Sequence, residues 1–246
     1  MTFRFSEFID IHTHILPGLD DGPQDMQGSI AIARCYAKLG ITTIVATPHF
    51  LPGTAWAPTK EQVLKSVQAL QANLDTANID LRVVAGMEIA YHKRLEERIL
   101  ANLVLPLGQS GYFLIEPSFQ GEQDGLLACL QSLLNKGRKL ILAHPERADM
   151  FQQMPQVLKK LVHQGLRIQI NAGSLLGNFG AKSKATAELL RQDNCIHFVA
   201  SDAHDVSKRG PLDVTAWQNL QGIPGGEALL LSCNAYIDEI FHADVG

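Results

Sequence analysis

The first residues of this sequence that can do chemistry are His12 and His14, which follow a short apolar run over residues 8–11. Side chains at positions i and i+2 of a β-strand point to the same face, so the two imidazoles can meet at one point. The paired carboxylates of Asp20 and Asp21 come shortly afterwards, beyond a Pro-Gly turn. This combination suits a divalent metal ion, although a His-x-His pair alone also fits two surface histidines.

The same arrangement recurs along the chain, where apolar runs of strand length end in a polar side chain that can bind metal. These runs cover residues 41–46, 81–87, 112–115, 139–143, 166–170 and 195–200. The polar residues that follow them are His49, Glu88, Glu116, His144, Asn171, Asp202 and His204. The carboxyl ends of the strands of a β/α barrel converge on one face, which holds the active site. The pattern therefore predicts one shared site built from residues that are far apart in the sequence.

Segments with helical spacing separate these runs and predict the fold. They cover residues 25–39, 58–76, 95–103, 126–134, 157–162 and 185–190, and a mostly helical tail follows over residues 212–240. About seven alternating strand-helix units imply parallel strands with right-handed crossovers. A chain of 246 residues fits a closed or nearly closed α/β barrel of such units. No long linker rich in Pro, Gly or Ser interrupts the sequence, so we expect one domain over residues 1–246.

The donor set predicted for the shared site combines imidazoles with carboxylates and contains no thiolate. Its members are His12, His14, Asp21, His49, Glu88, Glu116, His144, Asp202 and His204. This mixture favours zinc, manganese or iron over a structural cysteine-zinc site. One ion needs about three or four protein ligands, so the surplus predicts two or three ions with a bridging carboxylate such as that of Glu88. Clustered metal ions acidify a bridging water and can clamp a transferring phosphoryl or acyl group.

Arg147 and Arg209 lie shortly after His144 and His204, in loops expected on the same face. A guanidinium group binds phosphate oxygens in a bidentate manner and stabilises developing negative charge. A solvated surface arginine is the more common case for one residue alone, so the inference rests on the placement of both beside metal-binding motifs. Together they predict a substrate that carries a phosphate.

Composition and charge argue against several other classes of protein. The formal net charge of -4 offers no electrostatic footprint for nucleic acid. The four cysteines form no Cys-x-x-Cys pair, and none is followed six residues later by the arginine of a cysteine-based phosphatase. The N-terminus has no long apolar segment, and no window approaches the ~18 apolar residues of a membrane span. We therefore expect a cytoplasmic protein with reduced thiols and no membrane insertion.

Six short motifs carry most of the predicted site. They are the opening segment over residues 10–23, Ala46-Thr47-Pro48-His49, Gly86-Met87-Glu88, His144-Pro145-Glu146-Arg147, Asn171-Ala172-Gly173-Ser174-Leu175 and Ser201-Asp202-Ala203-His204. These motifs resemble the polymerase and histidinol phosphatase (PHP) superfamily. Within it they are most similar to the manganese-dependent protein-tyrosine phosphatases of bacterial capsule and exopolysaccharide loci. The resemblance runs from about residue 8 to about residue 210.

The resemblance implies a distorted, seven-stranded (β/α)7 barrel of the PHP type with a trinuclear metal site. The first ion would be held by His12, His14, Glu88 and Asp202, the second by Glu88, Glu116 and His144, and the third by Asp21, His49 and His204. Arg147, Arg209 and Asn171 would bind the substrate, the two arginines through its phosphate. Phe50 departs from the family, in which a second histidine usually follows Thr-Pro-His, and this change can alter the rim of the pocket.

The resemblance also implies the reaction and the partner. The substrate would be phosphotyrosine on the tail of a bacterial tyrosine kinase that controls polysaccharide export. A metal-bridging hydroxide would attack the phosphorus in line, with Mn²⁺ as the cofactor and Zn²⁺, Fe or Mg²⁺ as other possible ions.

Three alternative functions stay open at this point. A PHP-type enzyme can act instead on a small phosphomonoester such as histidinol phosphate, or on a nucleic-acid phosphodiester, which the acidic net charge disfavours. An amidohydrolase-type barrel also begins with His-x-His, but the matching strand ends here carry Glu88 and Glu116 and no bridging lysine. A metal-stabilised scaffold that binds a kinase without catalysis is the non-enzymatic alternative, and the complete donor set speaks against it.

Overall fold

Parallel β-strands form the centre of the protein in the computed structural model, which describes residues 4–121 and 125–241. The strands assigned in these ranges are β1 (Ile9–Thr13), β2 (Thr43–Ala46), β3 (His49–Phe50), β4 (Arg82–Ala85), β5 (Glu88–Ala90), β6 (Tyr112–Glu116), β7 (Lys139–Ala143), β8 (Arg167–Asn171) and β9 (Phe198–Ala200). They form one sheet in the order β1-β2-β4 and another in the order β3-β5-β6-β7-β8-β9. Every pairing between these strands is parallel, which confirms the predicted β/α class.

Two interrupted strands explain why nine strands are assigned where the sequence predicts seven units. Two residues separate β2 from β3, and two separate β4 from β5. Backbone hydrogen bonds continue across these gaps, from Gly86 N–H to the Ala46 carbonyl (2.9 Å) and from Glu88 N–H to the Pro48 carbonyl (3.1 Å). Counting each interrupted pair once reduces the nine strands to seven strand positions.

Gly86, in the gap between β4 and β5, is closely packed. A Cβ atom at this position would lie 2.8 Å from Leu107 Cδ2 and 3.1 Å from Val45 Cγ1, so a larger residue would have to displace these side chains. The strand predicted over residues 81–87 ends early, at Ala85. The chain resumes its strand at Glu88, whose side chain is fully buried inside the barrel.

The carboxyl ends of the first and last strands are joined directly. Thr13 and Ala203 form a parallel bridge. His14 N–H donates to the Ala203 carbonyl at 2.8 Å, and Asp202 N–H donates to the His12 carbonyl at 3.0 Å. Residues nearly 200 positions apart are thereby brought side by side where β1 and β9 end.

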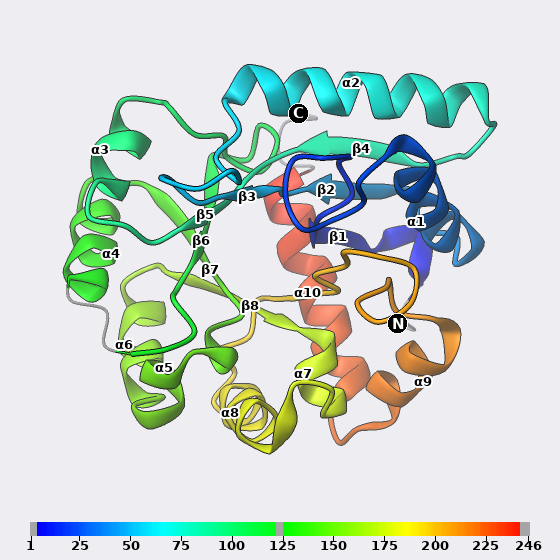
Figure 1. Ribbon diagram of the computed structural model, residues 1–246. Helices are drawn as coiled ribbons and strands as arrows, with labels where there is room; N and C mark the ends of the chain where they lie inside the picture. The colour runs from blue at the N-terminus through cyan, green and yellow to red at the C-terminus, as the bar shows by residue number, and fades with distance from the viewer. Residues whose placement is uncertain (1–3, 122–124, 242–246) are drawn as a thin grey trace.

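Helices surround the strands (Figure 1). They are α1 (Met26–Lys38), α2 (Lys60–Thr76), α3 (Leu95–Leu100), α4 (Leu126–Asn135), α5 (Asp149–Gln153), α6 (Gln156–His163), α7 (Ala172–Leu176), α8 (Gly180–Gln192), α9 (Val214–Gly222) and α10 (Gly226–Phe241), with short 3₁₀ turns at η1 (Phe5–Glu7) and η2 (Pro145–Arg147). Asp25 caps α1 by accepting from Gly28 N–H, and Thr59 forms a reciprocal capping box with Gln62 at the start of α2. The five-residue helices α5 and α7 are not predicted, because one turn is too short for a periodic apolar pattern.

The strands are buried on both faces, as parallel strands between helices must be. All residues of β1 and β9 are buried, and the predicted stripe of α2 is buried at Val63, Leu70 and Leu74. The C-terminal tail contributes to this core, because α10 packs against β9 and buries Cys233 and Ile237. None of the helices in the described ranges is long and apolar enough to cross a membrane. The expectation of one domain over residues 1–246 stays a prediction.

His197, which precedes β9, makes the stability of the fold depend on pH. Its Nδ1 accepts a hydrogen bond from Ile168 N–H at 3.1 Å, so this nitrogen carries no proton in the folded protein. Burial, and after it the charge of Arg167, lowers the pKa of His197 to about 4. The pKa in the unfolded chain is about 6.5, so the unfolded state binds the proton more readily as the pH falls from about 6.5 to about 4.

We therefore expect acid to destabilise the wild type more than a His197→Gln variant, which cannot titrate at this position. Between about pH 7 and about pH 4, the free energy of unfolding should fall by about 3 kcal/mol more in the wild type. Urea unfolding of both chelated proteins, followed by circular dichroism, measures this difference. The other histidines titrate in both proteins, so an identical pH dependence would contradict the prediction.

Candidate metal centre

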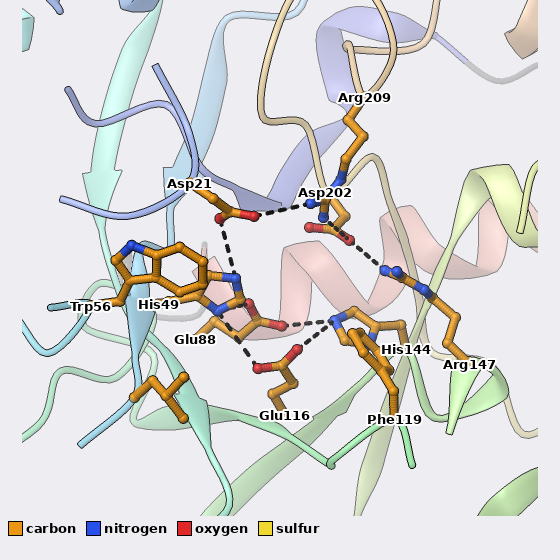
Figure 2. A pocket seen from close by; sticks show the side chains of 11 residues that line it. Asp21, His49, Trp56, Glu88, Glu116, Phe119, His144, Arg147, Asp202 and Arg209 are labelled. Atoms are coloured by element: carbon orange, nitrogen blue, oxygen red, sulfur yellow. Dashed lines mark hydrogen bonds and ion pairs between the residues drawn. The ribbon is translucent and has the colours of Figure 1, made fainter. Parts of the chain in front are cut away.

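All nine predicted donors lie together where the strands end, and Figure 2 shows those that line the cavity. Their ligand atoms form four overlapping groups, within each of which the atoms lie no more than 4.8 Å apart: His14, Asp21, His49 and His204; His12, Glu88 and His144; His12, His14 and Asp202; and His49, Glu88 and Glu116. The structure thus brings together every donor selected from the sequence. Their assignment to particular metal ions stays a prediction.

The innermost part of this cluster consists of His12, His14, Glu88 and Asp202, all buried. The Nε2 atoms of the two histidines lie 3.2 Å apart. That of His12 lies 3.2 Å from Glu88 Oε1 and 3.6 Å from Asp202 Oδ1. That of His14 lies 3.3 Å from Glu88 Oε2 and 3.4 Å from Asp202 Oδ1. Two imidazole nitrogens and two carboxylates therefore converge, as the ligands of a divalent ion do.

A chain of hydrogen bonds fixes which nitrogen of His12 carries the proton. The carboxylate of Asp202 can only accept, so Asn171 turns its Nδ2 towards Asp202 Oδ2 at 2.8 Å. Asn171 Oδ1 then accepts from Gln169 Nε2 at 2.9 Å, which leaves Gln169 Oε1 3.0 Å from His12 Nδ1. His12 Nδ1 must therefore donate, so in the neutral imidazole that binds metal Nε2 presents a lone pair to the cluster.

Two further acceptors orient His14 and His204 in the same way. His14 Nδ1 donates to Asp20 Oδ2 at 2.7 Å, and His204 Nδ1 donates to the backbone carbonyl of Asp202 at 2.9 Å. The Nε2 of His204 then faces Asp21 Oδ1 at 3.1 Å. A bare nitrogen that faces a carboxylate oxygen is repelled unless a proton or a metal ion lies between the two atoms. The donor chemistry therefore fits a metal ion.

Buried atoms without hydrogen bonds give the same indication. Glu88 Oε2 and His204 Nε2 have no hydrogen-bond partner, and such atoms are rare in folded proteins. Glu88 Oε2 lies 2.9 Å from His49 Nδ1, but the two atoms are not aligned for a hydrogen bond. A metal ion would provide a partner for both atoms.

The electrostatics of the cluster favour added positive charge. Burial lowers the pKa of His12, but the carboxylates of Glu88 and Asp202 outweigh it and raise that pKa to about 9. Burial, and then the charge of Glu88, raises the pKa of Glu116 to about 8. These groups hold protons strongly, and a divalent ion competes with protons for the same lone pairs.

Both predicted arginines reach the cluster. Arg147 Nη1 and Arg209 Nη2 lie 3.0 Å and 3.1 Å from the same oxygen, Asp202 Oδ2, and Arg209 Nη1 lies 3.3 Å from Asp21 Oδ2. Both arginines line a cavity of about 220 Å³ together with carboxylates of the cluster. Figure 2 shows their guanidinium groups pointing towards Asp202 from different sides. The cavity thus combines two fixed cations with the candidate metal ligands.

Asn171, which is predicted to bind substrate, lies beside Asp202. Its side chain is fully buried behind Asp202 and does not line the cavity. Its hydrogen bonds to Asp202 and Gln169 make it an orienting residue in this structure. A direct contact with substrate stays a prediction.

Two orienting residues escape prediction from the sequence, Asp10 and Gln169. The Asp10 carboxylate accepts from Tyr36 Oη at 2.9 Å and from Ser201 N–H at 3.2 Å, which anchors the loop that carries Asp202. Each lies between two isoleucines of a strand, two residues before a predicted site residue, so its side chain points to the same face as that residue. A polar residue two positions before a predicted site residue is the signal that could have identified Asp10 and Gln169.

Asp20 is a third such residue, since only its neighbour Asp21 was selected as a ligand. Its carboxylate accepts from His14 Nδ1 at 2.7 Å, from His49 N–H at 2.9 Å and from Gly22 N–H at 2.9 Å. We expect Asp20→Ala to weaken metal affinity about 10- to 100-fold, because His14 loses the acceptor that orients it. Metal content after dialysis measures this loss. Asp193→Ala, which removes an exposed carboxylate paired with Lys159, is the control, and equal metal retention in both variants would contradict the prediction.

A parallel β/α barrel with imidazoles, carboxylates and arginines at the carboxyl ends of its strands defines a class of metal-dependent hydrolases. Residues 8–225 match the model of the family described as capsular polysaccharide synthesis, CpsB/CapC. The tyrosine-protein phosphatase YwqE of Bacillus subtilis (strain 168) is 39% identical over 201 residues, which are 82% of this chain and 79% of that protein. The tyrosine-protein phosphatase CpsB of Streptococcus pneumoniae is 30% identical over 208 residues, 82% of this chain and 85% of that protein. The chain therefore belongs to the CpsB/CapC family.

Solved structures agree with this assignment. A chain from the crystal structures of YwqE from Bacillus subtilis and CpsB from Streptococcus pneumoniae, described as unique metal-dependent tyrosine phosphatases, superposes with a TM-score of 0.88. The match has 35% identity and covers 96% of this chain and 94% of that chain. A β-aspartyl dipeptidase from Fervidobacterium islandicum AW-1 superposes with a TM-score of 0.52 at 15% identity, covering 94% of this chain and 72% of that chain, which shows a shared fold alone.

Proposed function

We infer that this protein is a metal-dependent tyrosine-protein phosphatase. The observation that carries the conclusion is the convergence of five histidines, four carboxylates and two arginines at one cavity in a chain of the CpsB/CapC family. Imidazoles and carboxylates suit divalent ions, and arginines suit the phosphoryl group that such ions help to transfer.

We propose that the donors are shared among three ions. His12, His14, Glu88 and Asp202 would hold the first, Glu88, Glu116 and His144 the second, and Asp21, His49 and His204 the third. The central position of Glu88 supports a bridging role, since its oxygens lie 2.8–3.3 Å from nitrogen atoms of four histidines. The assignment of Glu116 to the second ion has weaker support. Its Oε1 lies 4.0 Å from His144 Nε2, and its Oε2 lies 3.6 Å from His49 Nδ1. We propose Mn²⁺ as the ion, with Zn²⁺, Fe and Mg²⁺ as the alternatives; the imidazoles favour Zn²⁺ and Fe over Mg²⁺ among these.

The residues of this chain have distinct parts in the reaction. When bound, the metal ions would supply Lewis acidity and an acidic water molecule. Arg147 and Arg209 bind the phosphoryl oxygens and stabilise the charge that develops on them. The chain of Asn171 and Gln169 keeps the proton of His12 on Nδ1, so that its Nε2 stays available as a ligand.

We also propose the biological setting of the reaction. The substrate would be phosphotyrosine on the tail of a bacterial tyrosine kinase of capsular or exopolysaccharide synthesis, and the protein would act in the cytoplasm. Two findings support the partner: the match to a family of capsular polysaccharide synthesis and the relatives that are tyrosine-protein phosphatases.

A metal-reconstitution experiment tests the function. Chelated protein receives Mn²⁺, Zn²⁺ or Mg²⁺ separately and is offered a phosphotyrosine peptide, histidinol phosphate and a phosphodiester. We expect chelation to abolish phosphotyrosine hydrolysis and Mn²⁺ to restore it best. Turnover of histidinol phosphate without turnover of phosphotyrosine would show a small-molecule phosphatase. Absence of turnover with every substrate and metal would favour the alternative of a metal-stabilised scaffold that binds a kinase without catalysis.

A further inference from the structure

Two exposed aromatic rings stand at the cavity above the metal centre. Nine large hydrophobic side chains are exposed in the described ranges, and only two of these are aromatic, Trp56 at 37% and Phe119 at 38%. Both of them line the cavity. Exposed apolar surface is unfavourable in water, so two rings at one opening indicate a ligand that covers them.

The ring of Trp56 is held in position before any ligand binds. Its indole lies nearly parallel to the His49 imidazole, with an angle of 14° and a centroid distance of 5.6 Å. The turn that carries it is closed by Leu51 N–H, which donates to the Trp56 carbonyl at 2.6 Å. Within the turn, Thr54 Oγ1 accepts from Trp56 N–H at 3.0 Å and donates to the Leu51 carbonyl at 2.8 Å. A ligand therefore meets an ordered wall and loses little affinity to ordering it.

The ring of Phe119 is held in position by contacts with Arg147 and His144. The guanidinium carbon of Arg147 lies 4.5 Å from the centroid of the Phe119 ring, and the His144 ring lies 5.4 Å away. The carbonyl of Phe119 accepts from Asp149 N–H at 3.0 Å, which ties this loop to the start of α5. Figure 2 shows Trp56 and Phe119 on opposite sides of Glu88 and Glu116.

We propose that Trp56 and Phe119 form an aromatic slot for the phenyl ring of phosphotyrosine and so select aryl over alkyl phosphomonoesters; this inference rests on the proposed phosphatase function. Glu88 and His144, at the floor of the cavity, are almost fully buried, whereas the two rings at its rim are exposed. With its phosphate beside the arginines and the candidate metal ligands, phosphotyrosine would direct its phenyl ring towards the rim, where the two exposed rings would stack on it. The short side chain of phosphoserine would require the peptide backbone to enter between the rings.

Two phosphonates that cannot be hydrolysed separate binding of the ring from binding of the phosphate. Phenylphosphonate and methylphosphonate present the same anionic group, and only the first carries a ring. In the Mn²⁺-loaded wild type we expect phenylphosphonate to bind about tenfold or more tightly than methylphosphonate, as measured by dissociation constants from calorimetric titration. The ratio should fall to about threefold or less in Trp56→Ala and in Phe119→Leu, and should be kept in Trp56→Phe.

A fluorescence measurement supplies an independent readout of the slot. The chain has two tryptophans, and Trp217 is buried at 2% exposure. Phenylphosphonate should therefore change the fluorescence of the wild type but not that of Trp56→Phe, and methylphosphonate should change neither. The control variant Leu103→Ala, which truncates an exposed leucine outside the cavity, should keep the wild-type binding ratio.

The outcomes distinguish failure of the slot from failure of the proposed function. Equal binding of the two phosphonates by the wild type would overturn the slot, even if phosphotyrosine is hydrolysed. Equal weakening of both phosphonates in Trp56→Ala, with unchanged metal content, would assign Trp56 to the support of His49 and would also overturn it. Wild-type protein that prefers phenylphosphonate but hydrolyses no phosphotyrosine would keep the slot and remove the phosphatase function.

Discussion

The Glu88→Gln variant is expected to lose about a thousandfold in kcat for phosphotyrosine, equivalent to about 4 kcal/mol of transition-state stabilisation. Glu88 is fully buried, and its two oxygens lie within 3.3 Å of nitrogen atoms of His12, His14, His49 and His144. Glutamine has almost the same shape but removes the negative charge at the centre of these contacts. The buried imidazoles would then have lost the carboxylate that bridges them, and the cluster would bind cations weakly.

Metal content and turnover should be measured on the same samples of Glu88→Gln. We expect it to retain fewer divalent ions than the wild type after dialysis, with an unchanged circular dichroism spectrum. Glu96→Gln is the control, because Glu96 pairs with Lys136 on the surface and belongs to none of the ligand groups. A Glu88→Gln protein with full metal content and more than a tenth of wild-type kcat would exclude a bridging role for this carboxylate.

Replacement of Arg147 by alanine should lower kcat/KM for phosphotyrosine by about 100- to 1,000-fold, as expected for the loss of one donor to a charged transition state. Its guanidinium lies between the rings of Phe119 and Phe179, at 4.5 Å and 4.2 Å, and is 3.0 Å from Asp202 Oδ2. These contacts hold the cation at the cavity wall before substrate arrives. Its removal takes away a positioned charge that mobile water would replace poorly.

Two further variants show whether the geometry of the guanidinium matters. Arg147→Lys keeps the charge but loses both the fork of donors and the stacking, so its activity should lie between those of the wild type and Arg147→Ala. Arg191→Ala is a matched control, because Arg191 is buried to a similar degree (18% against 17% side-chain exposure) and pairs with Glu188 away from the cavity. Equal activity of Arg147→Ala and Arg191→Ala would exclude Arg147 from phosphate binding.

The strand-end pattern explains why so much of the site could be predicted from sequence. Burial of parallel strands on both faces demands apolar runs, and each run ends at the face of the barrel where the carboxyl ends of the strands meet. A polar residue such as His49, Glu88 or His144 at that boundary is visible without an alignment. Seven strand positions and the clustering of the selected donors follow from this local signal.

Other features depended on contacts that no local pattern encodes. Gly86 lies in the gap between β4 and β5, and a Cβ atom there would meet Leu107, which comes from a distant segment. Asn171 ends a strand as predicted, yet it lies behind Asp202 because of the register between β8 and β9. The rings of Trp56 and Phe119 come from separate loops, and only the folded chain places them at the same cavity.

The sequence by itself determined the chemistry of this protein, because side-chain type and the alternation of strand residues are local properties. His12 and His14 share a face at any register of their strand. Only the tertiary structure decided the partners, such as Gln169 for His12 and Asp20 for His14, and with them the nitrogen that each histidine directs at the cluster. The physical reason is that a hydrogen bond requires two atoms to come within about 3 Å, which depends on strand order and register along the whole barrel.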